Sequence, residues 1–83
     1  MSHIYVLLSE KDRRSYVGST INLERRVREH NSGKCRSTIH RMPLKLVYSE
    51  EFDTISGARQ REMYLKTSAG RKELAQIFNK IDL

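Results

Sequence analysis

Five side chains in this chain have the types that phosphodiester hydrolysis requires: Tyr5, Tyr16, Arg26, His30 and Glu62. A tyrosine hydroxyl titrates at about pH 10 in isolation, and a nearby guanidinium or metal ion lowers that value so that a phenolate can act as general base. An arginine holds a phosphate through paired hydrogen bonds that strengthen as negative charge builds in the transition state. A strand tyrosine taken alone is more often a packing residue, so this chemistry requires the whole set to lie together.

The segment between residues 22 and 31 has the periodicity of a helix with an unusual inner face. Leu23, Arg26, Val27 and His30 follow the i, i+3, i+4, i+7 spacing of one helical face. An arginine and a histidine beside a buried leucine and valine indicate a cleft on that side. The outer face carries two pairs of opposite charge at i, i+4 spacing that suit water: Glu24 with Arg28, and Arg25 with Glu29.

Glu62 shares an apolar helical stripe with Ile55, Ala58 and Leu65. A carboxylate that points toward apolar neighbours is unfavourable unless it is paired or binds a metal ion. Two interpretations stay open. One is an internal ion pair, with Arg26 as a candidate partner. The other is a ligand to Mg²⁺ or a similar hard cation, whose other positions are filled by water and substrate phosphate; a single carboxylate suits a one-metal site better than a two-metal site.

Short strands must bring these residues together. Residues 3–8 and 15–19 are rich in strand formers and are separated by the polar break at 10–14, which predicts an antiparallel pair with Tyr5 and Tyr16 close in space. The first strand has no polar face and is expected to be buried on both sides. The second is expected to end in a tight turn at Gly18. A third strand is predicted at 44–52, with Leu44, Leu46 and Tyr48 on one face.

Three helices complete the predicted framework. The first begins at Asn22 or just before it and ends near Gly33, which can provide a left-handed cap. The basic segment 34–43 has no period and is expected to be a loop. Asp53 or Thr54 can cap a second helix that runs to about residue 66, and Ser68 can cap a third. The apolar face of the third helix consists of Leu74, Ile77, Phe78 and Ile81.

Size and charge narrow the class of protein. The 83 residues are enough for one domain, and 16 Lys and Arg against 10 Asp and Glu give a net charge of +6, which suits a polyanionic partner such as nucleic acid. Cys35 is the only cysteine, so an internal disulfide and a cysteine metal cluster are excluded. No apolar run is long enough to span a membrane and no secretory signal is visible, so a cytoplasmic location is expected.

The order and spacing of these residues resemble a known family. His3-Ile4-Tyr5, Tyr16-Val17-Gly18, Arg26, His30 and Glu62 together are similar to the GIY-YIG nuclease superfamily, and most of all to small members related to the nuclease domain of the excision-repair endonuclease. The similarity extends from about residue 4 to residue 74. His3 replaces the first motif glycine. Asn79 lies too far from Glu62 to be assigned as the family's late asparagine.

The resemblance implies an α+β fold in which helices flank a three-stranded antiparallel sheet, as a single domain over residues 1–83. It implies an endonuclease that depends on Mg²⁺ or Mn²⁺ and cleaves one DNA strand at a time. Its pathway stays open among DNA repair or recombination, mobile-element movement and nucleotide salvage. By position, Tyr5 and Tyr16 are the motif tyrosines, with Tyr5 favoured as general base and Tyr16 as the residue that orients water or phosphate. Arg26 would bind phosphate, His30 would assist proton transfer or position the base, and Glu62 would bind the metal.

A basic surface is expected to hold nucleic acid beside this site. Its members are Lys34, Arg36, Arg41, Arg59 and Arg61, which can neutralise phosphates on either side of the cut. Without a separate reader module, structure-selective or weakly sequence-selective cleavage is expected. A domain this small contacts few base pairs, which favours a homodimer or a recruiting partner protein. Two alternatives stay open: a non-catalytic module that binds nucleic acid or a partner protein, and a nuclease directed at RNA.

Overall fold

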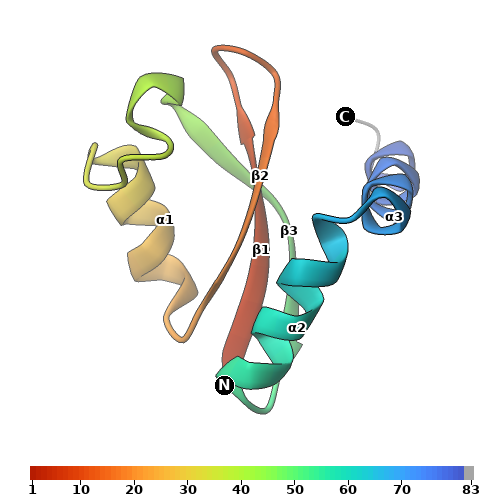
Figure 1. Cartoon of the computed structure of the whole chain (residues 1–83). Coiled ribbons are helices and arrows are strands. Elements are labelled where there is room, and N and C mark those ends of the chain that lie inside the picture. The colour runs from red at the N-terminus through yellow and green to blue at the C-terminus, as the bar shows by residue number, and fades with distance from the viewer. Residues whose placement is uncertain (82–83) are drawn as a thin grey trace.

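The computed structural model describes residues 1–81 and arranges them around one three-stranded antiparallel sheet (Figure 1). Strands β1 (Ser2–Ser9), β2 (Ser15–Thr20) and β3 (Leu44–Phe52) lie in the order β2-β1-β3. Helix α1 (Leu23–Asn31) covers one face of the sheet, and helices α2 (Ile55–Leu65) and α3 (Ser68–Lys80) lie on the other side. The expected α+β fold, a three-stranded antiparallel sheet flanked by helices, is confirmed.

The sheet has an apolar core on each face because successive side chains along a strand point to opposite sides. The core under α2 and α3 consists of Ile4, Val6, Val17, Ala58, Leu65 and Leu74. The core under α1 consists of Tyr5, Leu7 and Leu44, against which Leu23 and Val27 pack. β1 contributes to both cores and lies between two other strands, which confirms that it is buried on both faces.

The helices begin at side-chain caps, each of which accepts a hydrogen bond from a backbone N–H group of the first turn. Asn22 caps α1 as predicted, and Gly33 follows the helix with a left-handed φ of 80°. Of the two candidates for α2, Thr54 is the cap, through a bond from the N–H of residue 57. The predicted cap of α3 is wrong by one position, because Thr67 accepts from the N–H of residue 70 while Ser68 is already helical.

A β-bulge in β3 overturns the prediction for the faces of this strand. Val6 pairs with Tyr48, whereas the next residue of β1, Leu7, pairs with Leu46, so Val47 is an extra residue. The extra residue reverses the alternation. Leu44 and Leu46 therefore face α1, while Tyr48 packs with the core under α2 and α3.

The basic segment between α1 and β3 is not wholly irregular. It contains a short 3₁₀ helix at Ile39–Arg41, and Thr38 immediately before that turn is fully buried. Ser9 at the end of β1 anchors the turn, because its hydroxyl donates to the carbonyl of Arg41 at 2.6 Å. Within residues 1–81, none of the helices has the length and apolar character needed to cross a bilayer.

Candidate active site

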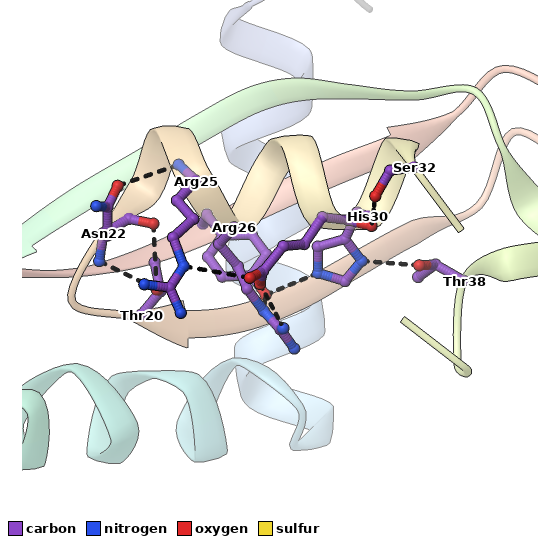
Figure 2. Close-up of polar contacts among 9 residues, drawn as sticks. Thr20, Asn22, Arg25, Arg26, His30, Ser32 and Thr38 are labelled. Carbon is purple, nitrogen blue, oxygen red and sulfur yellow. Dashed lines mark hydrogen bonds and ion pairs between the residues drawn. The ribbon is translucent and has the colours of Figure 1, made fainter. Parts of the chain in front are cut away.

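A chain of hydrogen bonds connects α1 to the central strand through the hydroxyl of Tyr5. The Nε–H of Arg26 donates to Tyr5 Oη at 3.3 Å, and Tyr5 Oη lies 2.9 Å from His30 Nε2. His30 Nδ1 lies 2.7 Å from Thr38 Oγ1 (Figure 2). Because the arginine can only donate, we assign the chain as Arg26 to Tyr5 to His30 to Thr38, with the histidine protonated on Nδ1.

Burial keeps Tyr5 and His30, the two central residues of this chain of hydrogen bonds, in their neutral forms. Tyr5 is 1% exposed, and burial raises its pKa to about 12, although the hydrogen bond and charge of Arg26 act in the other direction. His30 is fully buried, which lowers its pKa, and the positive charge of Arg26 lowers it further. A protonated, solvent-inaccessible phenol is a poor general base. Tyr5 as general base stays a prediction, and the burial of Tyr5 argues against it; His30 lies where it can position Tyr5.

Gly18 does not form the tight turn that the sequence predicts. It lies inside β2, directly opposite Tyr5 on β1, and the strand continues to Thr20. A Cβ atom at this position would lie 2.4 Å from Tyr5 Oη and 2.5 Å from its Cζ. The glycine is needed because the Tyr5 ring lies directly over its backbone.

Tyr16 is the motif tyrosine that solvent can reach. It lies on the same face of the sheet as Tyr5, two residues before Gly18, and it is partly exposed. Its ring centroid lies 6.4 Å from that of Tyr5 and 5.0 Å from that of His30, which confirms that the two strand tyrosines are close in space. The ammonium group of Lys66 lies 6.0 Å from the Tyr16 ring and places a positive charge beside it.

Arg26 projects from the inner face of α1 and keeps part of its guanidinium in solvent. Its side chain is 37% exposed, and its Nη1 pairs with Glu29 at 3.1 Å. The hydrogen bond to Tyr5 and the pairing with Glu29 raise the arginine pKa despite partial burial. The internal ion pair considered between Arg26 and Glu62 is not formed. The outer pairs predicted on α1 are present, with Glu24–Arg28 at 2.9 Å and Arg25–Glu29 at 3.2 Å.

Glu62 lies on the other face of the sheet and reaches the same edge strand. One carboxylate oxygen accepts from Ser19 Oγ of β2 at 2.6 Å, and the other pairs with Lys66 Nζ at 2.7 Å. Burial raises the pKa of Glu62, but the bonds from Lys66 and Ser19 outweigh it and keep the pKa below its ordinary value. The candidate residues therefore surround edge strand β2, with Tyr16 and Arg26 on the α1 side and Glu62 on the α2 side.

The donor set around Glu62 fits a hard cation with one protein ligand. Within residues 1–81, no group of three or more acidic, histidine or cysteine side chains is placed to hold a metal ion. A single ionised carboxylate matches Mg²⁺, which retains several waters and takes other oxygens from substrate phosphates. The side chain of Glu62 is 22% exposed, and its partner Lys66 is 52% exposed, so the ammonium group can move away from the oxygen that it covers.

The residues expected to contact nucleic acid differ in their surroundings. Lys34, Arg36 and Arg59 are exposed and form no ion pair within the described part of the chain. Arg41 pairs with Asp12 of the β1–β2 hairpin at 3.0 Å. Arg61 pairs with Glu50 at 2.9 Å and also with Glu73, so its charge is neutralised inside the fold.

Sequence reasoning missed three polar partners of these residues. Lys66 had a signal, because it follows Glu62 at i, i+4 spacing on one helix. Ser19 and Thr38 had none, since each meets its partner only through the tertiary fold, across 43 and 8 residues of chain respectively. These contacts fix the orientation of Glu62 and His30.

Comparison with known proteins decides which family this fold and site represent. Residues 1–75 match the model of the GIY-YIG catalytic domain. The chain belongs to the GIY-YIG family. It is 41% identical over 80 residues to a UPF0213 protein of Syntrophus aciditrophicus, covering 93% of this chain and 92% of that one. A UPF0213 protein of Natronomonas pharaonis is 44% identical over 73 residues, 86% of each chain.

A solved member of the family has the same fold. The solution NMR structure of a UPF0213 protein of Bacillus halodurans matches with a TM-score of 0.53 and 30% sequence identity, covering 93% of this chain and 85% of that one. GIY-YIG family membership points to a nuclease superfamily, whose members act on nucleic acid and are generally metal-dependent.

Proposed function

We propose that this protein is a metal-dependent endonuclease that hydrolyses phosphodiester bonds in DNA. One observation supports this most directly: a partly exposed Tyr16 lies on an edge strand, with Arg26 on one side of that strand and the ionised Glu62 on the other. A phosphodiester placed against this edge would meet a proton acceptor, a guanidinium and a cation-binding carboxylate. These are the three kinds of group that its hydrolysis requires.

In this proposal Tyr16 is the general base. Its phenolate would take a proton from a water molecule while the water oxygen forms a bond to phosphorus and the bond to the leaving oxygen breaks. The positive charge of Lys66, 6.0 Å from the ring, would stabilise the phenolate. Arg26 would hold the phosphate with the N–H groups that Tyr5 and Glu29 do not use. Tyr5 and His30 would position that guanidinium from beneath.

Glu62 would hold Mg²⁺ or Mn²⁺, with water and phosphate oxygens completing the coordination. When bound, the cation would neutralise part of the charge that builds on the phosphate in the transition state. Ser19 would keep one carboxylate oxygen oriented toward the edge of β2. Lys66 would have to release the other oxygen, which its exposure permits.

The proposed substrate selectivity is for DNA structure, with weak dependence on sequence. Phosphate contacts position a protein on DNA without reading bases, and the proposed contacts are all of this kind. Lys34, Arg36 and Arg59 form no ion pair among the described residues and so have charge for this purpose. Arg41 and Arg61 would contribute only by exchanging their carboxylate partners. A homodimer or a recruiting partner would extend the small contact area of one domain.

A non-catalytic nucleic-acid-binding module is the competing function. The pairing of both Glu62 oxygens with Ser19 and Lys66 favours it, because a carboxylate satisfied within the protein has a structural reason to be present. A nuclease directed at RNA is the second alternative, since a phosphodiester in RNA offers the same groups to this site.

The test is cleavage by the wild type and by Glu62→Gln, which keeps the size of the side chain and removes its charge. Glu51→Gln is the matched control, because Glu51 is exposed and outside the site. Each protein is incubated with supercoiled plasmid, branched DNA, single-stranded DNA and RNA, in Mg²⁺, in Mn²⁺ and in chelator. We expect metal-dependent DNA cleavage that falls at least about 100-fold in Glu62→Gln and is unchanged in the control.

Binding without cleavage in every protein and every metal would support the binding module. Cleavage confined to RNA would support the second alternative. Equal cleavage by wild type and Glu62→Gln would refute the assignment of Glu62 as metal ligand.

A further inference from the structure

An open groove of about 850 Å³ lies next to Tyr16, between the end of the β1–β2 hairpin and α3. Its apolar floor is formed by side chains of the sheet and of the two later helices, among them Leu8, Val17, Leu65 and Leu74. None of the basic residues predicted from the sequence to contact nucleic acid lines it. The groove is therefore separate from the basic surface that the sequence predicts.

The rim of the groove is strongly basic. Arg13 and Arg14 of the hairpin, Lys66 after α2 and Arg71 of α3 line it, and no lining residue is acidic. Arg13, Arg14 and Arg71 form no ion pair with any residue between 1 and 81. Three free guanidinium groups around one groove attract an anionic ligand and offer it hydrogen bonds.

Two aromatic side chains, Tyr16 and Phe78, also line the groove, and both are partly exposed. Aromatic rings beside cations hold single-stranded nucleic acid, because bases stack on the rings while the phosphates meet the positive charges. In a duplex the base faces are already stacked on one another. An apolar floor with exposed rings therefore suits unpaired nucleotides better than a double helix.

The groove is continuous with the proposed cleavage site through two shared residues. Tyr16 lines the groove and is the proposed base, and Lys66 lines it while pairing with Glu62 at 2.7 Å. A strand that lay along the groove would therefore bring one of its phosphates to the edge of β2. The four cations and the two rings all line the groove, and none of them belongs to α1.

We propose that this groove binds an unpaired DNA strand adjacent to the phosphodiester that is cleaved. This assignment rests on the proposed function, because it supplies the substrate class for the same edge strand. It makes flaps, overhangs and single strands the preferred substrates, with the phosphates held by Arg13, Arg14 and Arg71 and the bases held against Tyr16 and Phe78.

Equilibrium binding in chelator tests the groove without requiring catalysis. The double variant Arg14→Gln/Arg71→Gln removes two free charges from the rim, and Lys11→Gln/Lys72→Gln removes two exposed charges near them in sequence but outside the groove. The probes are a short dye-labelled DNA single strand, the same strand with abasic sites, and a duplex of equal length. Thermal unfolding of each variant verifies that it is folded, which is expected because these side chains are exposed and form no ion pair within the described part of the chain.

We expect the wild type to bind the single strand more tightly than the duplex. The abasic strand should bind about fivefold to tenfold more weakly than the intact strand, because stacking is lost. Arg14→Gln/Arg71→Gln should weaken single-strand binding about tenfold or more at low salt, and it should reduce the salt dependence by about 0.7 for each phosphate contact removed. The control pair should change the affinity less than about threefold, since no direct contact is lost.

Equal weakening of single-strand binding by the two double variants would overturn the proposal, because the net charge of the protein rather than the groove would then determine the affinity. Duplex binding as tight as single-strand binding, equal binding of the abasic strand, or no binding of the single strand would also overturn it. The cleavage assay tests the proposed nuclease function independently of binding in the groove. Metal-dependent cleavage without groove-dependent binding refutes the groove alone, and groove-dependent binding without cleavage refutes the nuclease alone.

Discussion

Replacing Gly18 with alanine should disrupt the buried centre of the candidate site. The added Cβ would lie 2.4 Å from Tyr5 Oη and 2.5 Å from Cζ, well inside contact distance. The ring cannot move outward freely, because Tyr5 is 1% exposed and its hydroxyl is bound to His30 and Arg26. The backbone of Gly18 is not left-handed, so alanine is opposed only by this collision.

The magnitude follows from three effects. Overpacking of a filled core destabilises by about 1–3 kcal/mol. Displacing Tyr5 leaves His30 Nε2 without its partner in a fully buried position, which costs about 1–3 kcal/mol more. Alanine in place of glycine within a strand returns about 0.5–1 kcal/mol of backbone entropy. The net expectation is destabilisation by about 3 kcal/mol, a fall in Tm of more than about 10 °C for a domain of this size.

Urea unfolding of a double-mutant cycle measures the effect and its cause. Tyr5→Leu removes the ring that the added methyl group would meet, so Gly18→Ala should be nearly neutral in that background. Gly57→Ala is the control, because its Cβ would have no neighbour closer than 3.4 Å and α2 gains helix propensity. Destabilisation by Gly18→Ala of less than about 0.5 kcal/mol, or the same loss in the presence and absence of the Tyr5 ring, would refute this reasoning.

Two further predictions concern the two motif tyrosines and His30. Tyr16→Phe should lower DNA cleavage about 100-fold or more while leaving urea unfolding unchanged. Tyr5→Phe should instead destabilise the fold by about 1–3 kcal/mol, because His30 loses its hydrogen-bond partner. The reverse pattern would support Tyr5 as the general base. The pKa of His30 is lower in the folded protein than its ordinary value of 6.5, chiefly through burial and then through the charge of Arg26. As pH falls, His30 therefore takes up a proton in the unfolded chain before it does so in the folded protein. The contribution of neutral His30 to stability is complete above about pH 6.5 and is lost as pH falls toward the folded pKa. Urea midpoints measured between about pH 5 and pH 8 should show this loss in the wild type and not in His30→Gln, and identical profiles for the two proteins would contradict it.

The sequence alone determined the elements and the set of candidate residues. Apolar runs without a helical period defined the strands, and the i, i+3, i+4, i+7 spacing placed Arg26 and His30 on the inner face of α1, where both lie. Asn22 and Gly33 marked the ends of that helix through local backbone chemistry. These features could be read because they depend on residues a few positions apart.

Only the tertiary structure decided where each candidate lies and what it contacts. Tyr5 and Tyr16 have the same side chain and neighbouring strands, yet one is sealed beneath α1 and the other is partly exposed at the edge of the sheet. The partner of Glu62 was Ser19 with Lys66, not Arg26, because α1 and α2 lie on opposite faces. The bulge at Val47 and the collision that makes Gly18 necessary also arise between strands. Exposure, pairing and register depend on contacts across long stretches of chain, which local periodicity does not encode.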